Sequence, residues 1–174
     1  IDLVTASTSM APAAMKYLRR MARLHAKKES AVHPNIYLSR RKTTRRILKN
    51  RELLDELALQ HDFANVCFED MSFIDQISSS TFAKRMLGQH GSGMDHCINL
   101  GRQKKVLHIS GIGLKAWPRM QSIISSFEID CRYLLAQSKP SNNLIPQNPE
   151  KISTSNLEVN ESHLKEALRW ITSD

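Results

Sequence analysis

The residues best suited to chemistry form a short glycine-containing stretch, His90-Gly91-Ser92-Gly93, between a predicted strand and a predicted helix. Glycine lets backbone N–H groups come close to an anion, and the amino end of a helix favours negative charge. Ligands commonly bind where a strand of a parallel sheet ends. These features predict an anion-binding loop at residues 90–93, with an ordinary turn as the alternative.

Arginines near another predicted strand end carry charge of the right sign for that loop. Ser39 and Arg40 end a strand, and Arg46 precedes a helix that Asn50 can cap. A guanidinium can bind a phosphate through two parallel hydrogen bonds. Because both strands are predicted in one parallel sheet, we expect these groups to emerge at the same edge as residues 90–93. A solvated basic surface is the alternative interpretation.

Charge is distributed unevenly along the chain. The net charge is +8, and residues 1–60 hold 13 Lys/Arg against 5 Asp/Glu, whereas residues 61–174 hold 12 of each. Such an asymmetry indicates an anionic partner, which could be a nucleic acid, a membrane surface or a phosphate-bearing ligand. The six glycines all lie within residues 88–113. We therefore expect the backbone to bend there for a functional reason.

Length and composition limit the class of protein. The chain has 174 residues, of which 41% are hydrophobic, so it can form one folded domain or a large piece of a two-domain protein. Its apolar runs are far shorter than the roughly 18 residues of a membrane span, so no transmembrane helix is expected. Three scattered cysteines do not form a disulfide framework, which favours a reducing compartment.

The elements that must position these residues alternate along the chain. Apolar periodicity predicts helices over 11–28, from 50, over 73–83, from about 94, over 118–127 and from 161. Strands are predicted over 35–39, 63–68, 85–87, 106–109 and 132–136. This alternation predicts an α/β fold, with a Rossmann-like parallel sheet and helices on both faces. Residues 137–160 lose the pattern and are predicted to be a loop or linker.

Other interpretations stay open at this point. Residues 111–116 match a relaxed dinucleotide fingerprint, G-x-G-x-x-A, but the acidic residue expected about 20 positions on is Asp130, just before the next strand. A nicotinamide enzyme is thus one alternative. The basic helix at 16–28 leaves nucleic-acid binding as another, although aromatic residues are only 6%. His90, Asp95, His96 and Cys97 lack a zinc spacing, so no metal site is predicted.

Four separated blocks together carry a family resemblance. They are Ile36-Tyr37-Leu38-Ser39-Arg40-Arg41, then Arg46-Ile47-Leu48 with Asn50 and Glu52-Leu53, then Met71-Ser72-Phe73 with Gln76, then Gly88 with His90-Gly91-Ser92-Gly93-Met94. In order and interval across residues 36–110, the chain resembles glycosyltransferase family 61. A weaker continuation extends to Ile171.

The resemblance implies the C-terminal, donor-binding half of a GT-B glycosyltransferase. Residues 1–30 would lead in from an acceptor domain that this chain lacks, and residues 31–136 would form the nucleotide-sugar-binding domain. Residues 137–160 would be a loop or linker, and a helix over 161–174 would pack on the domain.

The resemblance also implies a reaction. An activated sugar passes from a nucleoside diphosphate to a hydroxyl of a glycan or glycoprotein, with inversion and without a metal or cofactor, in polysaccharide synthesis. We expect no nucleic-acid partner, but peripheral membrane contact through residues 16–28. A bacterial protein would be cytoplasmic or membrane-associated, and a eukaryotic one would lie in the lumen of the secretory pathway. A catalytically inactive or binding-only homologue is the alternative.

By resemblance, the site divides into a diphosphate part and a base part. Arg40 and Arg46 would neutralise the diphosphate, residues 90–93 would cradle it, and residues 69–71 would lie beside the base. His90 and Arg46 would act in catalysis. Asp95 stands where the family pattern has Thr. The residues expected to bind the nucleotide sugar are Ser39, Arg40, Arg46, Asn50, Glu69, Met71, His90, Gly91, Ser92, Gly93, Met94 and Asp95.

Overall fold

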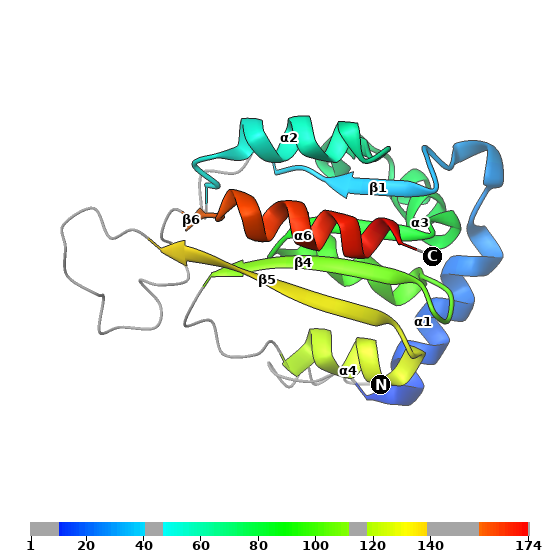
Figure 1. Ribbon diagram of the computed structural model, residues 1–174. Helices are drawn as coiled ribbons and strands as arrows, with labels where there is room; N and C mark the ends of the chain where they lie inside the picture. Colours follow the sequence, from blue (N-terminus) through cyan, green and yellow to red (C-terminus); the bar gives the residue numbers. More distant parts are fainter. Residues whose placement is uncertain (1–10, 41–46, 112–117, 139–156, 174) are drawn as a thin grey trace.

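The fold is built around one mostly parallel sheet (Figure 1). The computed structural model describes residues 11–40, 47–111, 118–138 and 157–173. Within those residues the strand order is β2-β1-β3-β4-β5-β6. The first five strands pair in parallel, and β6 runs antiparallel to β5. The strands are β1 Asn35–Leu38, β2 Ala64–Val66, β3 Arg85–Gln89, β4 Lys105–Gly111, β5 Asp130–Ser138 and β6 Leu157–Glu158.

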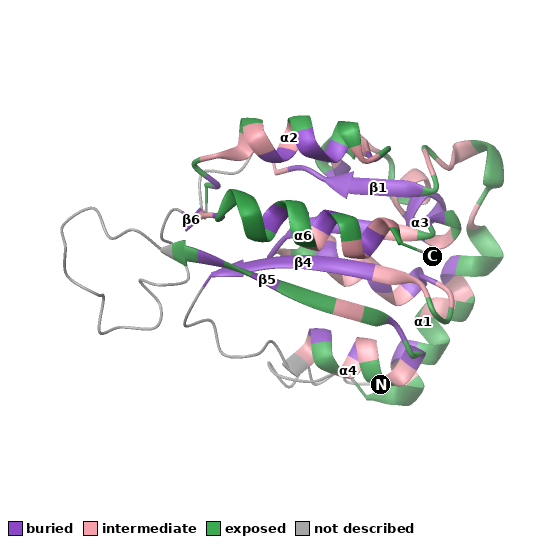
Figure 2. Cartoon of the chain, viewed as in Figure 1, coloured by how far each residue is buried: buried purple, intermediate pink, exposed green. Residues whose placement is uncertain are grey.

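Helices cover both faces of this sheet, as the sequence predicts. One hydrophobic cluster joins α2 and α6 to the sheet, and a second joins α1, α3, α4 and a 3-10 helix to the opposite face. The central strands β1, β3 and β4 are buried along nearly their whole length (Figure 2). The helices are α1 Pro12–His25, α2 Arg51–Gln60, α3 Phe73–Phe82, α4 Pro118–Phe127 and α6 Glu161–Thr172, with the 3-10 helix at Ser92–Asn99.

The start of α3 confirms the capping signal in the sequence. The Ser72 hydroxyl accepts a hydrogen bond from the Asp75 N–H at 3.2 Å and lies 2.6 Å from the Asp75 carboxylate, to which it donates. These bonds satisfy a backbone donor that has no partner in the first helical turn. Hydrogen bonds from Ser72 and Ser30 lower the pKa of Asp75.

Several sequence-based boundaries were wrong. The helix predicted from about residue 94 begins at Ser92 and is a 3-10 helix, because Ser, Gly, Asp, His, Cys and Asn in this segment are poor α-helix formers. The strand predicted over 63–68 shortens to β2, since a 3-10 turn at Phe68–Asp70 follows directly. The predicted loop over 137–160 contains the end of β5 and all of β6, which pairs with it.

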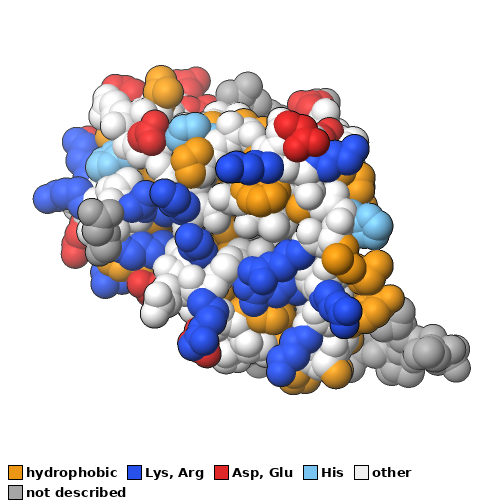
Figure 3. Space-filling view, turned by 90° about the vertical axis from the view of Figure 1, so that its right-hand side faces the viewer, with side chains coloured by type: hydrophobic (Ala, Val, Ile, Leu, Met, Phe, Trp, Pro, Cys, Tyr) orange, Lys and Arg blue, Asp and Glu red, His pale blue; other side chains and the backbone are white. Residues whose placement is uncertain are grey.

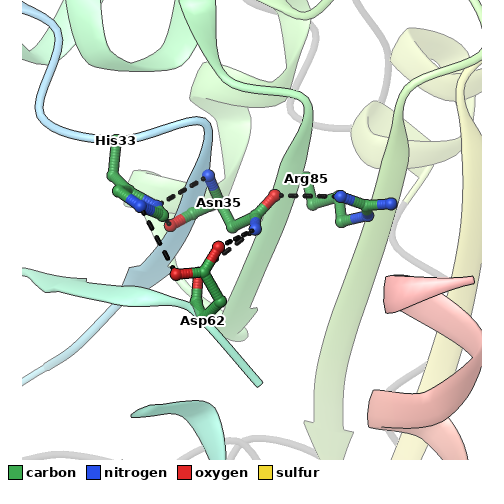
Figure 4. A network of polar contacts seen from close by, with 4 residues as sticks. All are labelled: His33, Asn35, Asp62 and Arg85. Atoms are coloured by element: carbon green, nitrogen blue, oxygen red, sulfur yellow. Dashed lines mark hydrogen bonds and ion pairs between the residues drawn. The ribbon is translucent and has the colours of Figure 1, made fainter. Parts of the chain in front are cut away.

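A network of hydrogen bonds and one ion pair connects the amino ends of β1 and β3 (Figure 4). The Asn35 side chain donates to the Asp62 carbonyl at 3.1 Å and accepts from Arg85 Nη1 at 3.3 Å. The Asn35 backbone N–H donates to His33 Nδ1 at 3.2 Å, and His33 Nε2 lies 3.6 Å from the Asp62 carboxylate. Arg85 Nε also donates to the Ile171 carbonyl at the end of α6. This network lies at the edge opposite residues 90–93.

The strand order creates a topological switch between β1 and β3. β2 lies on one side of β1, whereas the chain crosses to the other side to form β3 and continues outward through β4 and β5. Ligands of open α/β sheets bind at such a switch, beyond the carboxyl ends of the strands. Leu38 at the end of β1 is in register with Gly88 near the end of β3. The residues that follow these strands therefore lie next to each other.

Among the described residues, no helix has the length and apolarity needed to cross a membrane.

Candidate functional site

Arg40 and the glycine loop meet at the switch point. Arg40 Nη1 donates a 2.7 Å hydrogen bond to the carbonyl of His90, directly before Gly91. A Cβ built on Gly91 would lie 3.2 Å from both Arg40 Cζ and Nη1. The guanidinium thus lies against the Gly91 backbone. Burial lowers the pKa of Arg40 and the Glu69 carboxylate opposes that shift, but a guanidinium remains protonated in proteins.

Gly91 provides space rather than an unusual backbone conformation. Its φ of 169° and ψ of 170° are extended angles that any residue adopts, so the expected glycine-dependent bend is not found there. A side chain at this position would instead displace Arg40 by a few tenths of an ångström. The first backbone bond of the 3-10 helix runs from Met94 N–H to the Gly91 carbonyl. Among the described residues, no acceptor takes a hydrogen bond from the N–H groups of residues 91–93.

His90 belongs to the sheet in both its backbone and its side chain. Its N–H donates to the Ile109 carbonyl of β4 at 2.7 Å, which extends the β3–β4 ladder by one residue. The imidazole is only 3% exposed, and its Nδ1 lies 3.1 Å from Nε2 of His108. One of these two nitrogens donates and the other accepts, so the tautomer of one imidazole determines the tautomer of the other. His90 therefore holds the loop through its carbonyl and through this pair.

His108 is a residue of this site that the sequence analysis missed. It is 1% exposed in the middle of β4, stacks on His90 and contacts the Tyr133 ring at 5.2 Å between centroids. The available signal was a histidine inside the apolar run Val106–Ile109. Arg119, at the start of α4, was also missed, and nothing in its sequence surroundings marks it.

The Asp95 carboxylate forms an ion pair with Arg119 of α4. The Asp95 carboxylate lies 2.5 Å from Arg119 Nη2, and both side chains are partly exposed. Burial raises the pKa of Asp95, while the charge of Arg119 and its hydrogen bond act in the opposite direction. The negative charge that replaces the family's Thr is thus balanced by a cation on α4.

Met94 is part of the core. Its side chain is 2% exposed, and a Cβ on Gly88 would come within 2.4 Å of its sulfur. Gly88 therefore allows Met94 to pack under the end of β3. The Met94 side chain packs between the loop and the core and does not reach the protein surface.

Ser39 and Asn50 both have structural partners. The Ser39 N–H donates to the Val66 carbonyl at 2.9 Å, and its buried hydroxyl lies 3.4 Å from the same oxygen. The Asn50 amide donates to the Val159 carbonyl at 2.7 Å and accepts from the Val159 N–H at 3.1 Å. Asn50 occupies the N-cap position of α2, but the predicted side-chain cap bond is absent, because the amide pairs with Val159 instead.

Glu69 and Met71 lie after β2, beside the end of β1. Glu69 is exposed and its charge acts on Arg40, so both belong to the same edge of the sheet. Met71 is half-buried against the core. The Gln76 amide donates to the carbonyls of Phe68 and Met71 at 2.9 and 3.1 Å, which fixes this turn.

Two sequence-based predictions fall on other parts of the chain. Arg46 and residues 112–116 lie outside the described residues, and Gly111 is the last residue of β4. Among the residues that are described, no group of three His, Cys, Asp or Glu side chains converges as a metal site would require.

Comparison with known families agrees with the sequence blocks. A family model described as Glycosyltransferase 61 matches residues 3–107, which includes Arg40 and the loop at residues 90–93. No curated protein matches the chain. Because the family match covers more than half of the sequence, the chain belongs to glycosyltransferase family 61, and its general activity is that of a glycosyltransferase.

Proposed function

We propose that this chain is the donor-binding half of an inverting, metal-independent GT-B glycosyltransferase, which uses a nucleoside-diphosphate sugar. The observation that carries the proposal is the contact between the Arg40 guanidinium and Gly91 at the switch point of the sheet. It brings a fixed cation and the backbone N–H groups of residues 91–93 to one place. Such a pairing of charge and backbone donors suits a diphosphate.

The chemistry of sugar transfer explains why this pairing would be catalytic. As the bond between the anomeric carbon and the β-phosphate oxygen breaks, negative charge grows on the leaving diphosphate. Donors that are already oriented stabilise that charge without reorganising during the reaction. A guanidinium has five N–H donors, so its bond to the His90 carbonyl is compatible with a further bond to phosphate. Arg46 would add a second cation.

Inversion requires a single displacement at the anomeric carbon. The acceptor hydroxyl attacks from the face opposite the diphosphate, and a general base takes its proton. We assign that base to the acceptor-binding domain. The acceptor would be a glycan or glycoprotein, and the transferred sugar a hexose or pentose in polysaccharide synthesis. A catalytically inactive, binding-only homologue would keep the diphosphate site and lack turnover.

The decisive experiment is calorimetric titration with UDP and GDP in the presence of EDTA. Arg40→Ala should weaken nucleoside diphosphate binding by about 10- to 100-fold, because a charge-assisted hydrogen bond contributes about 1.5–3 kcal/mol. Arg40→Lys should recover only part of the affinity, since an ammonium lacks the planar fork. Arg169→Ala, at an exposed position on α6, is the matched control and should bind as the wild type does.

Two outcomes would contradict the proposal. If neither nucleotide binds without a divalent metal, the metal-independent donor site is wrong. If Arg40→Ala binds with unchanged affinity while its thermal unfolding is also unchanged, Arg40 does not contact the diphosphate. Binding without any sugar transfer from a panel of nucleotide sugars would favour the binding-only homologue.

A further inference from the structure

A second cationic surface lies on α1, at the edge of the sheet opposite Arg40. Helix α1 lies at the amino ends of the strands, whereas Arg40 and Gly91 follow their carboxyl ends (Figure 1). Arg19 of α1 donates to the carbonyl of Leu100, shortly before β4, and its guanidinium lies 4.4 Å from the ring centroid of Phe127, shortly before β5. Figure 3 shows that Lys and Arg side chains gather over this face of the molecule.

The charge on α1 has one sign. The helix contains four Lys or Arg residues and no acidic residue. Lys16, Arg20 and Arg23 are exposed, and among the described residues no carboxylate forms an ion pair with any of them. An open hollow of about 650 Å³ lies beside them, lined by Lys16, Arg19, Arg20, Arg23, Leu24, Arg102 and Phe127.

Apolar side chains are interleaved with these cations. Tyr17 is 63% and Leu24 is 67% exposed. They are seven residues apart, so they share one helical face, with Arg20 between them. A helix with this mixture of Lys/Arg and exposed apolar side chains suits the boundary between lipid headgroups and acyl chains.

We propose that α1 binds a membrane surface that contains anionic phospholipid. Lys16, Arg20 and Arg23 pair with lipid phosphates, while Tyr17 and Leu24 enter the headgroup layer. Exposed leucine and tyrosine side chains favour lipid over nucleic acid, because a duplex backbone offers them no apolar layer to enter.

The main test is cosedimentation with vesicles of equal parts phosphatidylglycerol and phosphatidylcholine. The chain should bind these vesicles and not vesicles of phosphatidylcholine alone. The triple variant Lys16→Gln/Arg20→Gln/Arg23→Gln should bind about a hundredfold more weakly, because each basic residue contributes about fivefold at an anionic surface. The matched control is Lys49→Gln/Lys165→Gln/Arg169→Gln, which removes three exposed cations elsewhere and should keep most of the binding.

A second variant separates lipid from nucleic acid. Tyr17→Ser/Leu24→Ser keeps every charge and should lower vesicle binding by about tenfold, because it removes apolar surface that the lipid would bury. Its affinity for duplex DNA should not change. Vesicle binding that is equal for this variant and the wild type would overturn the proposal, as would wild-type chain that fails to sediment with anionic vesicles. Titration with UDP is a separate measurement, so failure of either proposal leaves the other standing.

Discussion

The two edges of the sheet use positive charge in different ways. At the carboxyl edge, Arg40 is half-buried, bonded to a backbone carbonyl and packed against a glycine. At the amino edge, Lys16, Arg20 and Arg23 are exposed and have no carboxylate ion-pair partner among the described residues. A half-buried cation held by the backbone can position one small anion, whereas several exposed cations can contact an extended anionic surface. The charge excess of residues 1–60 therefore serves two distinct purposes in our proposals.

The largest expected effect comes from placing a carboxylate beside Arg40. Gly91→Asp should weaken UDP binding by on the order of a hundredfold, because the new side chain neutralises the guanidinium and repels the diphosphate. The extended backbone at Gly91 accepts aspartate, so the fold should be retained. Calorimetric titration measures the nucleotide affinity, and vesicle cosedimentation should show no change.

Gly101→Asp is the matched control for that variant. A Cβ on Gly101 would also lie near a cationic side chain, 3.3 Å from Lys104 Cε, but at the amino edge. It should leave UDP binding unchanged. If both aspartate variants reduce UDP binding equally, the two edges are not independent and the comparison between them fails.

A substitution at Gly88 should show how much core packing at the carboxyl edge contributes to stability. Gly88→Ala should lower the free energy of unfolding by about 1–3 kcal/mol, because overpacking a dense core forces neighbours to shift. The added methyl group would lie 2.4 Å from the Met94 sulfur and 3.2 Å from Leu38 Cβ. Urea denaturation measures the loss. Gly93→Ala, whose Cβ would have only ordinary contacts at 3.9 Å, should change stability far less.

The sequence predicted the elements better than it predicted the contacts at the site. Apolar periodicity located α4 and the Ser72 signal located the start of α3, because both depend on nearby residues. The pairing of Asn50 with Val159 joins positions 109 residues apart, so a local capping pattern could not distinguish it from a helix cap. The His90–His108 and Asp95–Arg119 pairs likewise depend on which strands and helices become neighbours.

The glycines illustrate the same limit. Their clustering in residues 88–113 predicted a functional bend of the backbone, but Gly91 is extended, Gly88 makes room for Met94 and Gly101 lies at the amino edge. Sequence reveals that a small residue is present, and only packing reveals what occupies the space beside it. By contrast, the proximity of Arg40 to the loop followed from topology alone, since both come after adjacent parallel strands.

Replacing Glu69 should change UDP binding less than the variants above, and the direction of the change distinguishes two roles of its carboxylate. Its carboxylate acts on Arg40 and contributes to raising the pKa of Cys67 to about 11, where burial is the main cause. If Glu69 only opposes the charge of Arg40, Glu69→Gln should strengthen UDP binding a few-fold, in keeping with a partly screened charge. Weaker binding of UDP would instead show that Glu69 contacts the nucleotide. Faster alkylation of Cys67 at alkaline pH would confirm that the carboxylate had been near the thiol.

The smallest expected effect concerns the ion pair between Asp95 and Arg119. Burial raises the folded-state pKa of Asp95, so the folded chain holds this proton more tightly than the unfolded chain does. The resulting stabilisation is complete below the unfolded pKa and is lost as pH rises through the folded pKa. Relative to Asp95→Asn, the wild type should therefore lose stability as pH rises from about 3 towards neutrality. At pH 7 the difference should stay within about 1 kcal/mol, because both side chains are partly exposed.

Urea denaturation of the wild type and Asp95→Asn across this pH range measures that difference. Glu128→Gln, which breaks the exposed ion pair with Arg102 at the amino edge, is the control for simple loss of one carboxylate. A wild type that instead gains stability over Asp95→Asn with rising pH would show that Arg119 outweighs burial. Asp95 would then be ionised in the folded chain and would hold α4 in place through Arg119.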